Sequence, residues 1–393
     1  MTSIVIIRHA EAEGNYYRRA HGHYDSLLTP NGEAQREALR NRFATQGFNA
    51  VYSSDMYRAK LTASILRRID GDPVRALPVL RELHLGDWED VPWGELAMCE
   101  TEALSIFMHH PGRFIGRGAS GESTGNMSNR MFDTVRALAR VHRGQNIAVV
   151  SHGLAIRALM AALKGLPLDR LQEIPHSDNT AVSLVKWDGL GSPSILFHGD
   201  NSHLGTLSTL GMQHWWRKNS RMTDTNLWFR PVVSPHDLSL ALNYQRDAWL
   251  TVYGTLDGFL DDVSRAQSER MLAAHPKAVV FAMREQTPVG LVQLDTEILM
   301  PDNTGHISLL YLIPETRGQS LGAQLIGHAV SVYRGIGRVG LHLRVARSNR
   351  PARRLYAKAG FHEIGREDGQ HGELIVMKMG IALDDERIVN VEC

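Results

Sequence analysis

Histidine and arginine side chains follow strand-like runs in the first half of the sequence. Arg8 and His9 come directly after the first short apolar run, and His152 comes after another such run. Arg58 lies in the first turn of a predicted helix that itself follows a strand-like run. In open α/β sheets, ligands bind beyond the carboxyl ends of the strands, and helix N-termini favour anions. Guanidinium and imidazole groups gathered at that edge predict a site for a phosphoryl group.

The elements that must position these side chains alternate in type. Short β-branched runs are followed by longer stretches with helical periodicity, which predicts a layered α/β domain. The predicted strands of this half are residues 3–7, 50–53, 146–150, 180–187 and 194–198, and its predicted helices are residues 31–46, 55–68 and 154–163. Thr29 and Pro30 open the first of these helices, and Gly165 follows the last, as expected at helix ends.

The chain divides near its middle. At 393 residues it is long enough for two domains of roughly 100–200 residues each. The predicted organisation is a first domain of residues 1–205, a connector of residues 206–226, a second domain of residues 227–383 and a tail of residues 384–393. The connector lacks regular periodicity, and Trp215 and Trp216 suggest that it packs on a domain.

The second domain also mixes both element types. Its predicted helices are residues 236–253, 257–274, 321–335 and 351–358, and its predicted strands are residues 278–284, 289–296, 306–313 and 341–345. Each half is large enough for a hydrophobic core of its own, so we expect the two halves to act independently.

The composition is that of an ordinary globular protein. Hydrophobic residues make up 43% of the chain and charged residues 22%, which excludes a disordered polymer. The net charge of +1 argues against a dedicated nucleic-acid or membrane-surface binder. Cys99 and Cys393 are too few for a disulfide framework or a cysteine metal cluster, and no apolar run approaches the ~18 residues of a membrane span. We therefore expect a cytoplasmic protein that requires no metal.

Several motifs of the first half occur in the order of a known family. They are Arg8-His9-Ala10-Glu11, then Asn15, then Asp25, Leu28, Thr29 and Gly32, then Ser53-Ser54-Asp55 with Arg58 and Ala59, then Arg81-Glu82-Leu83 with Gly86, Trp88 and Glu89, then Gly121-Glu122-Ser123, and finally Ser151-His152-Gly153. Together they resemble the phosphoglycerate-mutase-like branch of the histidine phosphatase superfamily, over roughly residues 1–205. One difference is Ala10, where the family's Arg-His-Gly-Glu signature has glycine.

The resemblance implies a three-layer α/β fold and a role for each motif residue. His9 would be the nucleophile that carries the phosphoryl group, and it must be neutral to attack. Arg8, Arg58 and His152 would stabilise the charge on the transferred group. Glu82 would protonate the leaving alkoxide and then activate a water molecule.

Other residues are expected to contact the substrate. By resemblance, Asn15 would hydrogen-bond the phosphate. The loop of residues 16–24 carries Arg18, Arg19 and His21, and it either lines the substrate pocket or is an ordinary exposed loop. Mutases of the family have a longer insertion after the acid motif, whereas residues 83–119 are short here, so a phosphatase is the better interpretation.

A different anion site is predicted in the second half. The strand-like run of residues 306–313 is followed by a turn and a long helix. Such a strand, turn and helix N-terminus point backbone N–H groups at an anion such as a pyrophosphate. The turn consists of Arg317, Gly318, Gln319, Ser320, Leu321 and Gly322.

This turn and a later motif resemble the GNAT N-acetyltransferase superfamily. The later motif contains Asn349, Ala352, Leu355, Tyr356, Gly360 and Phe361, and the resemblance covers roughly residues 227–383. It implies a mixed α/β fold and acetyl-CoA as co-substrate, with the turn holding the pyrophosphate. Backbone groups at Leu312 and Ile313 would pair with the pantetheine arm, Asn349 would contact the cofactor, and Tyr356 would protonate the departing thiolate. Ser320 replaces the first glycine of the family's turn.

The sequence thus predicts a bifunctional enzyme that hydrolyses a phosphorylated small molecule and acetylates a small amine. Two alternatives stay open. The second domain could only sense acyl-CoA beside an active phosphatase or phosphomutase, or the whole chain could be a regulatory binding protein. The four retained residues His9, Arg58, Glu82 and His152 disfavour the last alternative. Nothing in the sequence names either substrate.

Overall fold

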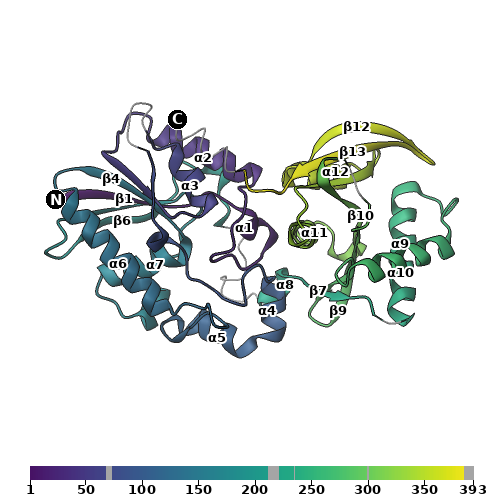
Figure 1. Ribbon diagram of the computed structural model, residues 1–393, viewed down its shortest axis with the longest axis horizontal. Coiled ribbons are helices and arrows are strands. Elements are labelled where there is room, and N and C mark those ends of the chain that lie inside the picture. Colours follow the sequence, from purple (N-terminus) through teal and green to yellow (C-terminus); the bar gives the residue numbers. More distant parts are fainter. Residues whose placement is uncertain (68–72, 211–220, 234, 299–300, 385–393) are drawn as a thin grey trace.

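The computed structural model describes residues 1–67, 73–210, 221–233, 235–298 and 301–384. Trp215 and Trp216, and all but the first residue of the predicted tail, lie outside these described residues. Figure 1 shows two lobes side by side, each with a sheet and helices around it. The chain is therefore a mixed α/β protein with one sheet in each half.

A sheet with the strand order β3-β2-β4-β1-β5-β6 forms the centre of the first lobe. The strands β1 (Thr2–Arg8), β2 (Ala50–Ser53), β3 (Arg75–Ala76) and β4 (Asn146–Ser151) run parallel to one another. The strands β5 (Val182–Trp187) and β6 (Ser194–Asp200) extend the sheet in antiparallel pairing. β1 is central because every residue from Ile4 to Ile7 is apolar and buried, as expected of a strand covered on both faces.

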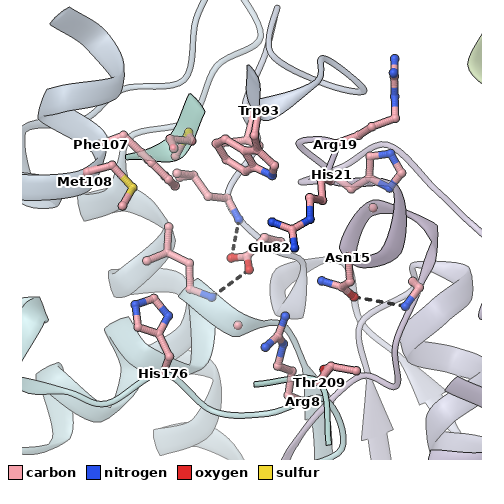
Figure 2. Close-up of a pocket in the computed structure, with 18 of the residues that line it drawn as sticks. Arg8, Asn15, Arg19, His21, Glu82, Trp93, Phe107, Met108, His176 and Thr209 are labelled. Atoms are coloured by element: carbon pink, nitrogen blue, oxygen red, sulfur yellow. Dashed lines mark hydrogen bonds between the residues drawn. The ribbon is translucent and has the colours of Figure 1, made fainter. Parts of the chain in front are cut away.

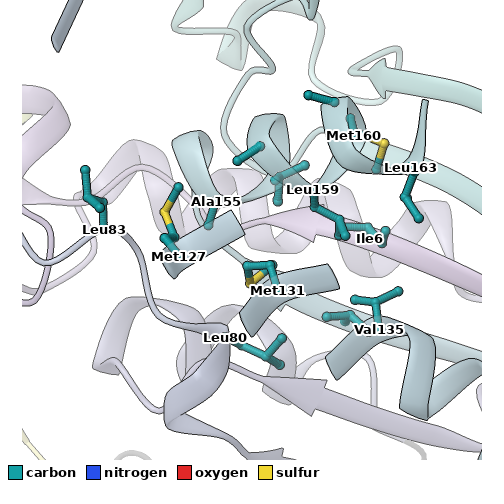
Figure 3. Packing of buried hydrophobic residues seen from close by; sticks show 14 of the residues in the cluster. Ile6, Leu80, Leu83, Met127, Met131, Val135, Ala155, Leu159, Met160 and Leu163 are labelled. Atoms are coloured by element: carbon teal, nitrogen blue, oxygen red, sulfur yellow. The ribbon is translucent and has the colours of Figure 1, made fainter. Parts of the chain in front are cut away.

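Helices cover both faces of this sheet. Ile4 and Ile6 pack with side chains of α6 (Thr124–Val141) and α7 (Gly153–Leu163), as Figure 3 shows for Ile6. Val5 and Ile7 point the other way and pack with α2 (Pro30–Arg42) and α3 (Tyr57–Ser64). The alternation follows from the two-residue period of a strand, and it produces the three layers that the sequence predicts.

Short elements extend from the carboxyl edge of the sheet. They are α1 (Glu13–Tyr17), η1 (Pro78–Leu80), α4 (Trp93–Cys99), α5 (Thr101–His109), η2 (Pro111–Arg113), η3 (Leu168–Glu173) and η4 (Gly205–Leu207). Gly86 shows how tightly these segments pack. It has a φ of +65°, and an added Cβ would lie 1.7 Å from the carbonyl oxygen of Arg117. Only glycine fits there.

The second lobe contains a sheet with the strand order β12-β13-β11-β10-β9-β8-β7. Its strands are β7 (Trp228–Pro231), β8 (Val279–Arg284), β9 (Thr287–Asp295), β10 (Thr304–Leu312), β11 (Gly340–Ala346), β12 (His362–Gly369) and β13 (Gly372–Gly380). Its other elements are α8 (Met222–Thr225), α9 (Pro235–Tyr253), α10 (Asp261–Ala274), η7 (Pro301–Asn303), η8 (Pro314–Thr316), α11 (Gly322–Gly335) and α12 (Arg350–Ala359). The strands β7, β12 and β13 were not predicted from the sequence.

β10 and β11 pair in parallel over only part of their length. The pairing runs from Thr304 to Ile307 on β10, although the strand continues to Leu312. Successive side chains of β8 point to opposite faces of this sheet. Phe281 packs with α9 and α10 on one face, and Ala282 packs with α11 on the other. The partial separation of β10 from β11 leaves main-chain groups of β10 beside the second cavity described below.

The two lobes are in direct contact through α1 and α11. Tyr17 of α1 is 4% exposed and belongs to the hydrophobic core of the second lobe. An added Cβ at Gly327 of α11 would lie 2.5 Å from the Cβ of Tyr17, so a glycine is needed for this approach. The lobes therefore share a packed junction, which the sequence analysis did not predict.

Candidate active site

The parallel pairing of β1 and β4 brings two histidines together. Arg8 lies opposite Ser151 in the strand register, so His9 and His152 follow at the same edge of the sheet. Their ring centroids are 5.1 Å apart. Both side chains are buried, with 6% of His9 and none of His152 exposed. The predicted convergence of the two strand ends is therefore present.

A cavity of about 1120 Å³ opens at this edge. All but one of the residues proposed for phosphoryl transfer and substrate binding line it, namely Arg8, His9, Asn15, Arg18, Arg19, His21, Arg58 and Glu82. His152 lies against His9 behind them. Figure 2 shows how Arg8, Asn15 and Glu82 face one another across the cavity.

His9 is held in the form that a nucleophile needs. Its Nδ1 lies 2.7 Å from the carbonyl oxygen of Ala10, which can only accept, so Nδ1 carries the proton. The lone pair is then on Nε2. Burial, with the positive charges of Arg58 and Arg8, lowers the pKa of His9 well below its usual value. The imidazole is therefore neutral at pH 7.

The groups around His9 suit an anion with several oxygens. Arg58 is 1% exposed and Arg8 is 8% exposed. Within the described part of the chain, Arg8 Nε and both ring nitrogens of His152 are buried without a hydrogen-bond partner. Burial is the main cause that lowers the pKa of His152, and the nearby charge of Arg58 lowers it further. The ring is therefore neutral at pH 7, so one of its nitrogens donates a hydrogen bond and the other accepts one. Buried polar groups normally have partners, so this cluster fits a bound phosphoryl group.

Two loops orient the arginines. Arg58 donates to the carbonyl oxygens of Tyr24 at 2.9 Å and Gly22 at 2.7 Å. Arg8 donates to the carbonyl oxygen of Ser177 at 2.6 Å. An added Cβ at Gly153 would come within 3.3 Å of Arg8 Nε, so the small residue leaves this guanidinium its room.

Glu82 is fixed by main-chain donors. Its Oε1 accepts from the N–H groups of Leu83 and Ala155, both at 2.9 Å, and its Oε2 accepts from Leu154 at 2.9 Å. Leu154 and Ala155 form the first turn of α7, whose own N-cap residue, His152, makes no side-chain capping bond. Because a carboxylate has about four acceptor positions, one position on Oε2 is left for a proton or a water molecule.

Asn15 and a loop missed by the sequence analysis support the same site. Asn15 Oδ1 accepts from Ala12 N–H at 3.1 Å and from Asn179 Nδ2 at 3.3 Å, which leaves its amide NH₂ to face an anion. Asn179 also donates to the carbonyl oxygen of His9 at 3.0 Å. Asn179 lies in the loop just before β5. Because β5 runs antiparallel to β1, the start of β5 lies where β1 ends. Only the strand direction, which the sequence does not give, places Asn179 and Ser177 there.

The loop residues Arg18, Arg19 and His21 line the cavity, but they differ in their partners. Arg19 Nε and His21 Nε2 both donate to Asp90 Oδ1, at 2.6 and 3.0 Å. Arg18 NH1 lies 3.3 Å from Thr225 Oγ1 at the end of α8. The guanidinium of Arg19 is thus engaged in holding the loop.

An apolar wall on the other side of the cavity was not predicted. Trp93, Phe107 and Met108 gather there, away from Arg8 (Figure 2). The rings of Trp93 and Phe107 stack with centroids 5.9 Å apart. The helices α4 and α5 supply these side chains, and their spacing in the sequence looks like that of ordinary core residues.

A second cavity of about 1050 Å³ lies in the second lobe. Of the residues predicted to bind the cofactor, those that line it are Leu312, Arg317, Gly318, Ser320, Leu321, Gly322 and Asn349. Ile313 is instead partly buried and packs against the core of the second lobe. Gln319 is exposed and bonds to Arg284 and to the carbonyl oxygen of Glu315. Asn349 Oδ1 also caps α12 by accepting from Ala352 N–H at 3.2 Å. Ser320 has a φ of +59°, the conformation that glycine adopts most easily, so the turn is kept despite the substitution.

Tyr356 lines the same cavity and is 8% exposed. Burial raises the pKa of Tyr356 to about 12, so the phenol keeps its proton at neutral pH. His306, which the sequence analysis did not single out, also lines this cavity, with its Nδ1 3.1 Å from that of His342. Burial and the neighbouring His342 lower the pKa of His306 to about 4, so it is neutral. The two nitrogens can share one proton between them.

Comparison with known proteins decides the family. Residues 4–201, half of the chain, match the histidine phosphatase superfamily (branch 1). The chain belongs to this superfamily. Residues 242–361 match the acetyltransferase (GNAT) family, so the second half carries a GNAT domain. Both predicted resemblances are confirmed, and the protein is an enzyme that joins a histidine-phosphatase domain to an acetyltransferase domain.

Relatives of the histidine-phosphatase domain bear two kinds of name. A probable phosphoglycerate mutase GpmB of Serratia proteamaculans is 34% identical over 209 residues, which is 52% of this chain and 96% of that protein. A metal-independent phosphoserine phosphatase of Arabidopsis thaliana is 35% identical over 161 residues, or 40% of this chain and 67% of that protein. Among solved structures, YhfR of Bacillus stearothermophilus is 32% identical with a TM-score of 0.49 and covers 52% of this chain and 99% of that one.

The described residues contain neither a candidate metal cluster nor a candidate membrane-spanning helix. No cluster of three or more histidine, cysteine, aspartate or glutamate side chains there is arranged to hold a metal ion. No described helix has both the length and the apolar character needed to cross a membrane.

Proposed function

We propose that the histidine-phosphatase domain hydrolyses small-molecule phosphomonoesters through a phosphohistidine at His9. One observation carries this proposal. A neutral His9, with its lone pair on Nε2, lies in one cavity with Arg8, Arg58 and the carboxylate of Glu82. The cluster provides a nucleophile, cationic partners for the phosphoryl oxygens and an acid–base group, which together are sufficient for hydrolysis without a metal.

The reaction has two steps. In the first, His9 Nε2 attacks phosphorus, the bond from phosphorus to the ester oxygen breaks, and Glu82 gives its proton to the leaving alkoxide. In the second, Glu82 takes a proton from a water molecule, the water oxygen attacks phosphorus, and the phosphorus–nitrogen bond breaks. Inorganic phosphate leaves, and His9 and Glu82 return to their starting states. Arg8 and Arg58 stay in place and stabilise the charge on the phosphoryl oxygens in both steps.

Hydrolysis needs room for a water molecule beside the bound ester. At about 1120 Å³ the cavity is much larger than one phosphate, and it leaves room for water beside a bound ester. Trp93, Phe107 and Met108 offer apolar surface to the alcohol part of the substrate. We therefore propose a phosphomonoester whose alcohol carries apolar or aromatic surface.

For the second domain we propose acetyl transfer from acetyl-CoA to a small amine. The cavity beside the partly separated strands β10 and β11 fits a long pantetheine arm, and the turn before α11 fits a pyrophosphate. When bound, acetyl-CoA would supply an activated thioester. Tyr356 holds a proton that it can donate to a departing thiolate, and Arg317 is positioned by its Nε–H bond to the carbonyl oxygen of Leu312 at 2.8 Å.

The test is a screen of phosphorylated metabolites and aryl phosphates for phosphate release, with and without acetyl-CoA. Mass spectrometry of the same mixtures detects acetylated amines. Phosphate release that disappears in His9→Ala supports the phosphatase. An acetylated product supports the transferase, whereas a change in phosphatase rate without any acetylated product would favour the acyl-CoA sensor.

A further inference from the structure

Helix α11 of the acetyltransferase domain faces the substrate loop of the phosphatase domain. The loop consists of residues 18–24, directly after α1. Tyr17, at the end of α1, is buried in the core of the second lobe beside Gly327 of α11. Two polar side chains of the same helix, Ser331 and Arg334, reach across to groups that hold the loop.

Ser331 completes a network around Asp90. Its hydroxyl donates to Asp90 Oδ2 at 2.6 Å and accepts from Arg19 NH2 at 2.9 Å. Asp90 Oδ1 accepts from Arg19 Nε at 2.6 Å and from His21 Nε2 at 3.0 Å. A residue of the second domain thus closes the network that orients two side chains of the phosphatase cavity.

Arg334 makes the second connection. It lies 3.0 Å from the carboxylate of Glu13 and 3.4 Å from the hydroxyl of Tyr24, with its guanidinium 5.9 Å from the centre of that ring. From its own domain it is held by the carbonyl oxygen of Ile381, at 2.7 Å from NH2. Burial by itself would lower the pKa of Arg334, but the charge and hydrogen bond of Glu13, together with Tyr24, more than offset it, so the pKa is raised. The charge of Arg334 is therefore secure at the junction.

The loop transmits this support to the phosphate site. The carbonyl oxygens of Gly22 and Tyr24 accept hydrogen bonds from the guanidinium of Arg58. Arg58 is almost fully buried, so its direction depends on these acceptors. A shift of the loop would move the guanidinium relative to the phosphoryl oxygens, and a displacement of about 1 Å can cost about 10²-fold in rate.

We propose that α11 is a positioning element of the phosphatase site, acting through Ser331 and Arg334 on the loop of residues 18–24 and so on Arg58 and His21. This inference rests on the proposed phosphatase activity. It makes the acetyltransferase domain a contributor to the rate of the phosphatase, whatever acetyl transfer it performs. Helix α11 would then be part of the acetyltransferase domain and also position the phosphatase site.

The experiment uses the full-length protein and three substitutions. Arg334→Met removes the charge and the hydrogen bonds, and Ser331→Ala removes one oxygen with almost no change of volume. Arg338→Met is the matched control, because Arg338 follows α11 and bonds to Asn303 within the second domain. We measure kcat and KM on nitrophenyl phosphate, and binding of inorganic phosphate and of vanadate by calorimetry. Vanadate forms a five-coordinate complex that resembles the transition state of phosphoryl transfer.

Positioning predicts a specific pattern. In Arg334→Met and Ser331→Ala, kcat falls about 10- to 100-fold with KM nearly unchanged, and vanadate affinity falls more than phosphate affinity. Arg334→Lys, which keeps a charge toward Glu13, restores part of kcat. Arg338→Met behaves as the native protein does.

The inference is overturned if vanadate binding and kcat in Arg334→Met and Ser331→Ala stay within about twofold of the native protein. It is also overturned if kcat and vanadate affinity fall as far in Arg338→Met as in those two variants. If Arg334→Met does not fold, Ser331→Ala alone decides. If the native protein binds vanadate but hydrolyses no ester, the proposed function fails, and the vanadate affinities of the variants still decide whether α11 positions the site.

Discussion

Replacing Glu82 by glutamine tests the general acid and also disturbs its surroundings. Three N–H groups, from Leu83, Leu154 and Ala155, point at the two oxygens of Glu82. Glutamine offers one oxygen and an NH₂ group, so one of the three N–H groups would face another donor. The variant therefore loses both the transferable proton and one main-chain hydrogen bond.

The two losses have different sizes. An unsatisfied, partly buried N–H costs about 1–3 kcal/mol. This loss lowers stability and affects all substrates equally. Loss of acid–base help costs about 10²–10⁴-fold in rate, but only where the leaving group needs a proton. An alkoxide needs one, whereas a nitrophenolate does not.

The assay compares kcat/KM for an alkyl phosphate and for nitrophenyl phosphate in the native protein, Glu82→Gln and Glu37→Gln. Glu37 is the control, because it pairs with Arg40 on the exposed side of α2. We expect the alkyl ester to suffer about 10²-fold more than the aryl ester in Glu82→Gln. Since Glu82 also activates water in the proposed mechanism, the aryl ester should give a burst of nitrophenolate as phosphohistidine accumulates.

Equal losses on the two esters, without a burst, would refute the reasoning. Glu82 would then be a group that only caps α7 and orients the site. A melting temperature unchanged from the native protein would separately contradict the argument from the three N–H groups.

Three further predictions concern His9, the buried histidines and Tyr356. His9→Ala should abolish hydrolysis of an aryl phosphate while the circular dichroism spectrum stays native, and native-like turnover would remove the phosphohistidine mechanism. Because the pKa values of His9 and His152 are lowered below the usual 6.5, the unfolded chain binds more protons than the folded one below pH 6.5. These two histidines should therefore leave the free energy of unfolding unchanged above pH 6.5. Below pH 6.5 each should lower it by about 1.4 kcal/mol per pH unit. Equal denaturant midpoints at about pH 7.5 and about pH 5.5 would contradict this prediction. Tyr356→Phe should slow acetyl transfer about 10²-fold with acetyl-CoA affinity unchanged by calorimetry, and a loss of binding with normal turnover would assign Tyr356 to the cofactor instead.

The sequence by itself determined much of the phosphatase domain. Arg8, His9 and His152 directly follow apolar runs, and parallel strands must bring such residues to one sheet edge. The motif order was also sufficient to recognise both families, which the comparisons confirm. The Ser320 substitution was visible in advance, and only its φ of +59° shows that the turn tolerates it.

Other elements could not be predicted because their signal is not local. The strands β12 and β13 form a hairpin whose residues alternate weakly, since β12 is largely exposed at the sheet edge. Asn179 reaches His9 only because β5 runs antiparallel to β1, and strand direction is a property of the sheet rather than of the segment.

The junction between the halves was decided by the tertiary structure alone. The sequence places the chemical motifs in separate halves, which led us to expect that residues 1–205 would be active alone, and that expectation stays a prediction. Ser331 and Arg334 carry no motif and sit on a helix that is buried along most of its length, and they meet Asp90 and Glu13 across 241 and 321 residues of chain. A local pattern records which residues an element buries, but it does not record which distant element will be packed against it.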